Sequence, residues 1–184
     1  MHPADVAAFV ADRADDLRHE LARYQELGVT RISLEDSVQL HITFIKEDHR
    51  VVQQAVPSGM FGARGEQIHR MFEVPLIGAP KATRELILHM DCTDFDSVPP
   101  AANLLLPDRS QLPDDQWPAI GPGGIIRGHR DYNRPAFCRR GLREYHSHVQ
   151  HEDDPWDRYR EGLSLSAIAL SLLDDLKHRW GGKL

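Results

Sequence analysis

The sequence predicts an α+β fold in which an antiparallel β-meander is flanked by an N-terminal helix and by C-terminal helices. Apolar residues recur at helical spacing near both ends of the 184-residue chain, and they alternate with polar residues at period two in between. The third observation is a dense run of proline and glycine between residues 107 and 135, which interrupts regular structure. We expect a single domain over residues 1–184.

The N-terminal helix is predicted over residues 1–27. Its apolar residues are three, four or seven positions apart, whereas aspartate, arginine and glutamate occupy the other face. Gly28 follows as a residue typical of helix ends. The apolar stripe consists of Val6, Phe9, Val10, Leu17, Leu21 and Tyr24.

The strand meander predicted over residues 29–106 begins with strands at 29–34 and 38–45, joined by a turn at 35–37. Residues 57–81 contain scattered glycine and proline, so we expect mostly loop there, with one short strand near 72–75. Further strands are expected at 84–92 and 101–107.

Residues 107–151 predict an ordered, irregular loop that ends in a hairpin, because its large apolar side chains need a buried environment. C-terminal helices follow over residues 154–180, with Asp154 expected as the N-cap and Pro155 at the first helical position. The apolar residues of the loop are Trp117, Ile120, Ile125 and Ile126, and those of the helical stripe are Leu165, Ile168, Ala169, Leu172, Leu173 and Leu176.

Composition argues against several classes of function. The chain has 22 Lys and Arg against 28 Asp and Glu, a net charge of −6, so it lacks the basic surface typical of nucleic-acid binding. No apolar run approaches the roughly 20 residues needed to cross a bilayer, and the acidic first residues do not resemble a signal peptide. With two cysteines, no disulfide framework is expected, and a reducing cytoplasm is the predicted location.

The densest group of metal-binding residue types lies at Cys138, Glu144, His146 and His148. In an extended strand, positions 144, 146 and 148 project from one face. A turn at residues 139–142, with Gly141 at positive φ, would fold Cys138 back toward that face. This ligand set favours zinc over ferrous iron, and calcium or magnesium would require oxygen ligands instead. The alternative interpretation is a solvated strand face beside a buried thiol.

Other residues are weaker candidates. His129 and Asp131 could orient a metal ligand, or they could be ordinary loop residues. His151 could also reach the ion, as could Asp153 and Asp154. Cys92 is expected to be a small buried apolar side chain.

The run from Cys138 through Glu144, His146 and His148 resembles the pattern that names the CEHH predicted metal-binding domain family of bacteria. The similarity extends over most of the chain. The resemblance implies a metal site at these four residues. It also implies a place in gene neighbourhoods for prokaryotic ubiquitin-like conjugation, with a ubiquitin-like protein and an activating-enzyme homologue as partners.

The order of elements also resembles the ubiquitin-conjugating-enzyme (UBC) fold. Residues 95–100 are similar to that family's proline-containing turn, and Cys138 falls near its thioester cysteine, whereas the His-Pro-Asn tripeptide is absent. Separately, His146 and His148 resemble the His-x-His of JAMM-type zinc isopeptidases, although the Ser-x-x-Asp that follows in those enzymes is absent.

Three functions follow as hypotheses. The first is a zinc-binding, UBC-like conjugating or accessory component of a bacterial ubiquitin-like pathway, with a structural metal. The second is a metal-dependent hydrolase in which Glu144 acts as general base on a zinc ion held by Cys138, His146 and His148. The third is conjugation chemistry, in which Cys138 itself carries a ubiquitin-like protein as a thioester.

Overall fold

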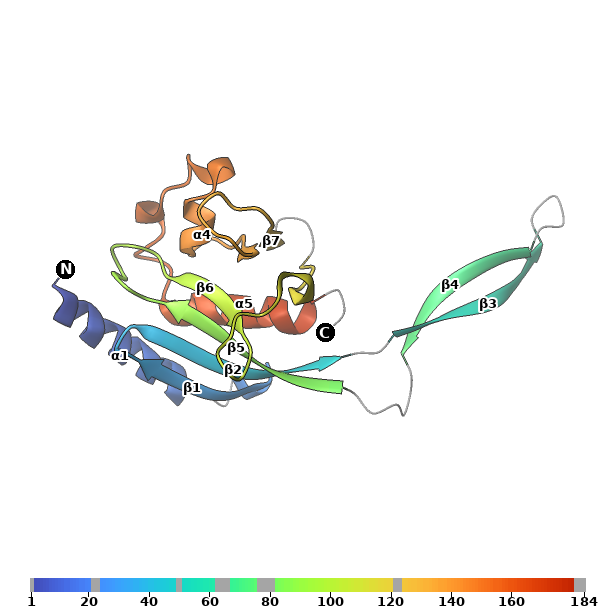
Figure 1. Cartoon of the computed structure of the whole chain (residues 1–184), viewed down its shortest axis with the longest axis horizontal. Helices are drawn as coiled ribbons and strands as arrows, with labels where there is room; N and C mark the ends of the chain where they lie inside the picture. Colours follow the sequence, from blue (N-terminus) through green and yellow to red (C-terminus); the bar gives the residue numbers. More distant parts are fainter. Residues whose placement is uncertain are drawn as a thin grey trace. The chain divides into compact units, whose positions relative to one another are not determined.

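The computed structural model of the chain describes residues 2–20, 24–48, 51–61, 67–75, 82–120 and 124–180 (Figure 1). The chain divides into two compact units. The first consists of residues 1–46 and 85–184, and the second of residues 47–84. The predicted α+β class is confirmed, because helices near both ends of the chain accompany an antiparallel sheet.

The sheet of the first unit has four strands in the order β1-β2-β5-β6. Strand β1 pairs antiparallel with β2, and β5 pairs antiparallel with β6. Asp36 and Ser37 adopt positive φ in the turn between β1 and β2, which confirms the turn predicted there. The strands are β1 (Val29–Glu35), β2 (Gln39–Asp48), β5 (Ala82–Asp91) and β6 (Ala101–Leu105).

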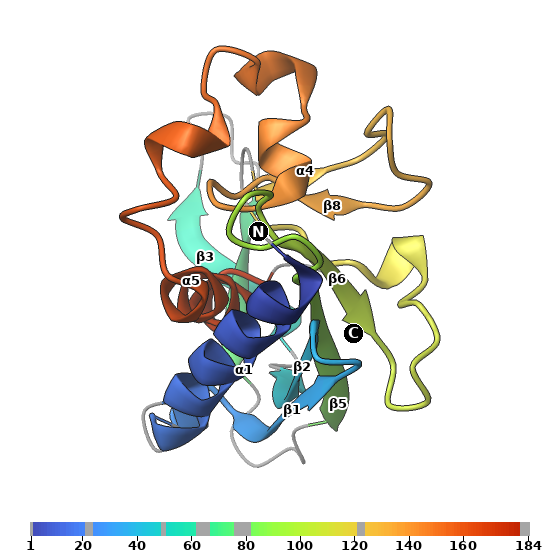
Figure 2. The same cartoon turned by 90° about the vertical axis from the view of Figure 1, so that its left-hand side faces the viewer.

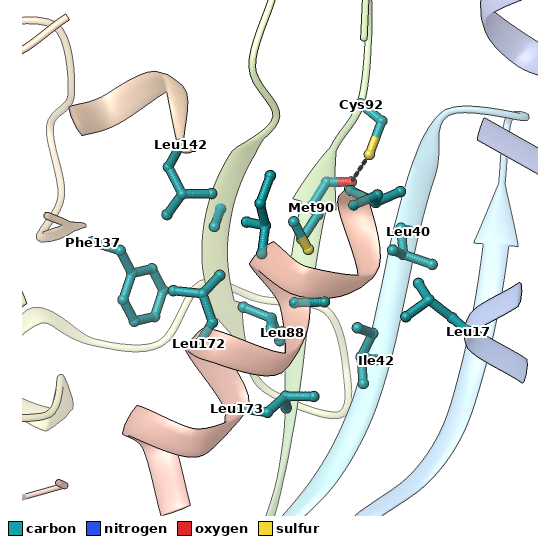
Figure 3. Packing of buried hydrophobic residues seen from close by; sticks show 14 of the residues in the cluster. Leu17, Leu40, Ile42, Leu88, Met90, Cys92, Phe137, Leu142, Leu172 and Leu173 are labelled. Atoms are coloured by element: carbon teal, nitrogen blue, oxygen red, sulfur yellow. Dashed lines mark hydrogen bonds between the residues drawn. The ribbon is translucent and has the colours of Figure 1, made fainter. Parts of the chain in front are cut away.

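The helices α1 (Pro3–His19) and α5 (Leu165–His178) lie side by side against the sheet (Figure 2). Alternate residues of β2 and β5 enter the same buried cluster as the apolar stripes of both helices (Figure 3). The predicted stripe of α5 is buried along its whole length. Of the predicted N-terminal stripe, Leu21 lies outside the described residues, and Phe9 is only partly buried.

Cys92 belongs to this core. Its side chain is fully buried, and its Sγ donates a hydrogen bond of 3.7 Å to the carbonyl oxygen of Met90 (Figure 3). Burial raises the pKa of the Cys92 thiol to about 12, because a thiolate is poorly solvated there. The expectation that Cys92 is a small buried apolar residue is therefore confirmed.

The second unit contains an antiparallel hairpin of β3 (Val51–Phe61) and β4 (Gln67–Pro75). The prediction of mostly loop over residues 57–81 is therefore wrong for 57–61 and 67–71, and the rest of that stretch outside β4 lies outside the described residues. Proline and glycine suggested a loop, yet Pro57 pairs with His69, and the register shifts between Pro57 and Phe61. Such irregularities are where a strand tolerates these residues.

The segment from β6 to α5 is largely irregular, as predicted. It contains the two-residue strands β7 (Ile125–Ile126) and β8 (Ala136–Phe137) and the short α-helix α4 (Arg143–His146). It also contains three 3-10 helices, η1 (Asp114–Gln116), η2 (Val149–His151) and η3 (Trp156–Arg158). Trp117 and Ile120 are buried as expected, whereas Ile125 and Ile126 are half-buried.

The predicted cap of the C-terminal helices is wrong. Pro155, rather than Asp154, is the N-cap residue of the short 3-10 helix η3, and no side chain among the described residues caps this helix. The long helix α5 begins only at Leu165, where the hydroxyl of Ser164 accepts a hydrogen bond from the Ala167 amide. The side chain of Asp154 is engaged by other side chains rather than by helix amides. Among the described helices, none is long and apolar enough to cross a membrane.

Candidate functional site around Cys138

The backbone around Cys138 is fixed on two sides. Upstream, β8 pairs with β7, and the Cys138 amide donates to the carbonyl of Gly124. Downstream, Gly141 adopts a φ of +94°, which confirms the positive φ predicted for the turn. A Cβ at Gly141 would lie 3.0 Å from the Ile168 side chain of α5, so the turn also lies close to the core.

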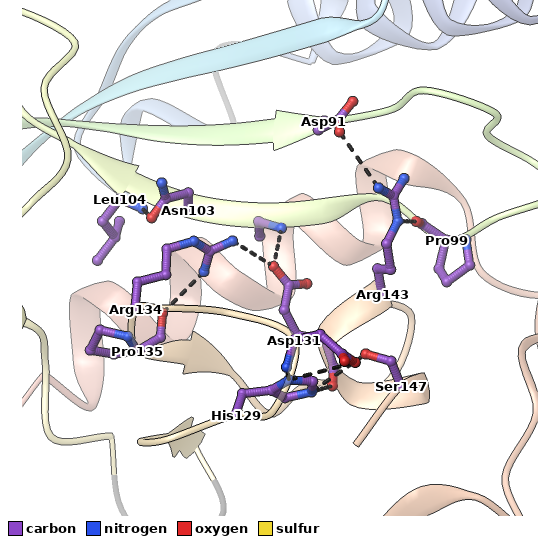
Figure 4. Close-up of polar contacts among 12 residues, drawn as sticks. Asp91, Pro99, Asn103, Leu104, His129, Asp131, Arg134, Pro135, Arg143 and Ser147 are labelled. Atoms are coloured by element: carbon purple, nitrogen blue, oxygen red, sulfur yellow. Dashed lines mark hydrogen bonds and ion pairs between the residues drawn. The ribbon is translucent and has the colours of Figure 1, made fainter. Parts of the chain in front are cut away.

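Residues 143–146 form the short helix α4, so the extended strand predicted for this stretch is wrong. The amides of His146 and Ser147 donate to the carbonyls of Leu142 and Arg143, four residues earlier. Arg143 itself is bonded from its backbone to Pro100 and from its side chain to Pro99 (Figure 4). In a helix, residues two apart point about 200° away from each other, so Glu144 and His146 cannot share a face.

Glu144 points toward the sheet. Its side chain is completely buried, and Oε1 accepts hydrogen bonds of 3.0 Å from the Ala102 amide of β6 and 3.0 Å from Nη2 of Arg134. Burial raises the pKa of the Glu144 carboxyl, and the Arg134 guanidinium opposes that shift. The carboxylate therefore joins α4 to the sheet edge and to the loop that carries Arg134.

His146 points to the other side of α4, and both of its ring nitrogens are used. Nδ1 donates to the carbonyl oxygen of Asp154 at 2.7 Å, and Nε2 accepts from the Gly141 amide at 3.3 Å. Because a carbonyl only accepts and an amide N–H only donates, these bonds define the neutral tautomer. Burial lowers the pKa of His146, which also favours the neutral ring.

The short turn η2 brings His151 back to Cys138. Nε2 of His151 lies 3.4 Å from Sγ of Cys138, which is half-buried. Burial raises the pKa of the Cys138 thiol, with the Arg139 charge opposing it, and burial lowers the pKa of His151. The pair therefore favours a neutral thiol that donates to a neutral imidazole.

His148 lies between two other histidines. The centre of its ring is 5.7 Å from that of His151 and 5.4 Å from that of His129. Its Nδ1 is buried and has no hydrogen-bond partner among the described residues. His148 thus lies near the thiol–imidazole pair, and no hydrogen bond among the described residues joins its ring to either member.

His129 has a structural position. It is buried, its Nε2 donates to the carbonyl oxygen of Glu144 at 3.0 Å, and its Nδ1 accepts from the Asp131 amide at 3.1 Å (Figure 4). The carboxylate of Asp131 is 4.0 Å from Nδ1. His129 therefore holds its own loop against α4 through backbone groups.

The four predicted zinc ligands are not brought together. Cys138 contacts His151, Glu144 contacts Arg134 and Ala102, and His146 is bonded to backbone groups. Within the part of the chain that the structure describes, no three His, Cys, Asp or Glu side chains are grouped so that they could hold a metal ion. Zinc binding by this set stays a prediction, and it would require Glu144 and His146 to exchange their present partners.

The pairing of Cys138 with His151 depends on a turn that no pattern in the sequence indicated. The sequence presents His151 as a candidate metal ligand rather than as a partner of the thiol, and it presents Asp154 as a helix N-cap that could also reach the metal. The only signal in the sequence is a stretch rich in histidine, which does not indicate which histidine contacts Cys138. No protein-family model matches this chain, and no curated protein is significantly similar to it.

Proposed function

We propose that this chain is a conjugating component of a bacterial ubiquitin-like protein pathway and that Cys138 accepts the C-terminal acyl group of the modifier as a thioester. The observation that carries the proposal is the distance of 3.4 Å between Sγ of Cys138 and Nε2 of His151. A nucleophile within hydrogen-bond reach of a base is the minimal arrangement for covalent acyl transfer.

The environment of the pair is compatible with this chemistry. Because burial raises the pKa of Cys138, the thiol retains its proton at neutral pH and needs a base before it can attack. His151 remains unprotonated there because burial lowers its pKa. Its Nε2 can therefore accept the proton as sulfur attacks a thioester carbonyl, and can return it to the departing donor thiolate. One thioester is broken and one is formed, so no oxidant or metal is required.

The arrangement of elements gives further support. An N-terminal helix, a four-stranded antiparallel sheet, a long loop with a cysteine and a C-terminal helix against the sheet follow each other in the order expected of a UBC-like chain. Cys138 follows β8, outside the core cluster, and is accessible enough to meet a reagent. The modifier and its activating enzyme are the partners that this proposal implies.

The hydrolase hypothesis has less support. A general base must reach a metal-bound water, whereas the carboxylate of Glu144 is fully buried and bonded to Ala102 and Arg134. Its second oxygen, Oε2, is also buried and has no partner among the described side chains and amides. The contacts of Glu144 favour a structural role over a catalytic one.

The proposal can be tested without the natural partners. A short peptide that ends in Gly-Gly, supplied as its 2-mercaptoethanesulfonate thioester, is incubated with the protein, and the intact mass is measured without reductant. We expect one acyl addition that dithiothreitol reverses, that Cys138→Ser abolishes and that His151→Ala slows by about tenfold or more. Cys92→Ala is the matched control and should behave like the wild type, because Cys92 is buried.

Metal content is measured on the same samples, because a bound zinc ion would occupy the thiol. Acylation that persists in Cys138→Ser, or its absence from metal-free wild-type protein, would contradict thioester chemistry. About one zinc per chain, lost in Cys138→Ser and blocking acylation until it is chelated, would instead support the accessory, metal-binding hypothesis.

A further inference from the structure

The imidazole of His151 is covered by an aromatic ring from α4. The rings of Tyr145 and His151 are stacked with centres 3.9 Å apart and an angle of 15° between their planes. A tyrosine ring stacked at this distance restricts rotation of the imidazole. Nε2, on the edge of the same ring, lies 3.4 Å from Sγ of Cys138.

Tyr145 is held in turn by Asp154. Its hydroxyl donates a hydrogen bond of 2.9 Å to Oδ2 of Asp154. The Asp154 carboxylate is itself fixed by the hydroxyl of Tyr159 and by the Arg140 guanidinium. The backbone closes the same loop, because the Asp154 amide donates to the carbonyl of His151 at 2.9 Å.

We propose that Tyr145, anchored by Asp154, is a positioning residue that holds the His151 imidazole against Sγ of Cys138. Among the described residues, the only other groups that contact the His151 ring are the thiol itself and the tilted ring of His148. The positioning is a property of the structure alone, whereas its consequence for acyl transfer depends on the proposed function.

Tyr159 provides a matched control within the same network. Its hydroxyl also donates a hydrogen bond to Oδ1 of the Asp154 carboxylate. Its ring, however, contacts Arg140 and His146 rather than His151. Loss of the Tyr159 hydroxyl therefore removes one hydrogen bond to Asp154 and leaves the ring on His151 in place. Tyr145→Phe and Tyr159→Phe each remove one hydrogen bond to Asp154 and keep the ring, so a loss that occurs in Tyr145→Ala but in neither of these variants reports on the stack.

The first readout is spectroscopic and needs no substrate. A stacked phenol ring shifts the ring-proton signals of His151 in an NMR spectrum, and His151→Gln assigns those signals by their loss. We expect Tyr145→Ala to move the signals to the positions of an unstacked histidine, and Tyr145→Phe to restore most of the shift. Tyr159→Phe should leave them unchanged.

The second readout is the rate at which iodoacetamide alkylates Cys138 at pH 7, measured in the presence of a chelator. We expect Tyr145→Ala to slow alkylation about as much as His151→Ala does, and Tyr145→Phe to remain within about threefold of the wild type. Cys92→Ala serves as the background for every variant, so that only Cys138 is labelled. These measurements are made on the full chain.

The outcomes separate the two proposals. Unchanged His151 signals in Tyr145→Ala, or equal losses in Tyr145→Ala and Tyr159→Phe, would overturn the positioning role even if the peptide thioester is accepted. Altered signals and slower alkylation, in a protein that never accepts the peptide thioester, would support the positioning role and overturn the proposed function alone.

Discussion

The buried carboxylate of Glu144 gives the sharpest test of how the site is built, because a structural role predicts a loss of stability and a metal-binding role predicts a loss of bound metal. In the structure, Oε1 accepts from the Ala102 amide and from Arg134, whose side chain is only 14% exposed. Glu144→Ala would leave the guanidinium without its carboxylate and the amide without an acceptor. Removing one partner of a buried pair costs about 3–5 kcal/mol.

We therefore expect Glu144→Ala to lower the free energy of unfolding by about 3–5 kcal/mol, or to lower Tm by roughly 6–20 °C. Glu144→Gln keeps an acceptor for Ala102 but loses the charge opposite Arg134, so its effect should be intermediate. Urea unfolding followed by tryptophan fluorescence measures this change, because the buried Trp117 and Trp156 both lie in the same compact unit as Glu144.

The matched control is Glu152→Ala. Glu152 is 62% exposed and lies 3.9 Å from the exposed Arg130, so its removal should change stability by less than about 0.5 kcal/mol. If Glu144→Ala is no less stable than this control, the structural reasoning is refuted. If Glu144→Ala loses a metal ion that the wild-type protein binds, Glu144 is a ligand as the sequence predicted.

Two further predictions concern the sheet of the same unit. Gly28→Ala should lower the free energy of unfolding by about 2 kcal/mol or more in a urea titration, because Gly28 has a φ of +84° and its new Cβ would lie 2.6 Å from the carbonyl oxygen of Ile45. Gly162→Ala, whose Cβ would meet nothing closer than 3.8 Å, should stay close to the wild type, and equal losses in both would contradict this explanation. Burial lowers the pKa of His89 from 6.5 to about 4, so its protonation favours the unfolded chain. The stability that His89 contributes above pH 6.5 is therefore lost as pH falls toward 4, and thermal melts of His89→Gln should show a shallower loss of Tm over this range; an unchanged slope would contradict the assignment.

The parts of the fold that could be predicted from the sequence are those whose side chains repeat over many residues. The stripe of α5 and the alternation in β2 each provide several periods. The whole stripe of α5 is buried, and so are Leu40, Ile42 and Phe44 of β2, although His41 between them is buried too. The β3–β4 hairpin could not be predicted in the same way, because Pro57 and nearby glycine residues interrupt the alternation there. A two-stranded hairpin accommodates them through a register shift, which local composition does not indicate.

The local structure of the candidate site could not be predicted for a related reason. Glu144, His146 and His148 provide only two periods of alternation, which is too short a pattern to distinguish a strand from a short helix. The choice between strand and helix was decided by contacts from outside the segment. Pro100 and Pro99 fix Arg143, and Ala102 and Arg134 receive the Glu144 side chain.

Because α4 is helical, neighbouring residues on it contact different parts of the protein. On one face, Glu144 is hydrogen-bonded to the sheet and to Arg134. The next residue, Tyr145, contacts His151 and Asp154. The Tyr145 ring that stacks on His151 therefore comes from the same short helix that Glu144 anchors in the protein interior. Weakening the anchor should disturb the distance between Cys138 and His151 without any change to either residue. We therefore expect Glu144→Gln to change the rate of Cys138 alkylation. A metal site at the four predicted ligands would instead require α4 to unwind first, because Glu144 and His146 point away from each other in the helix.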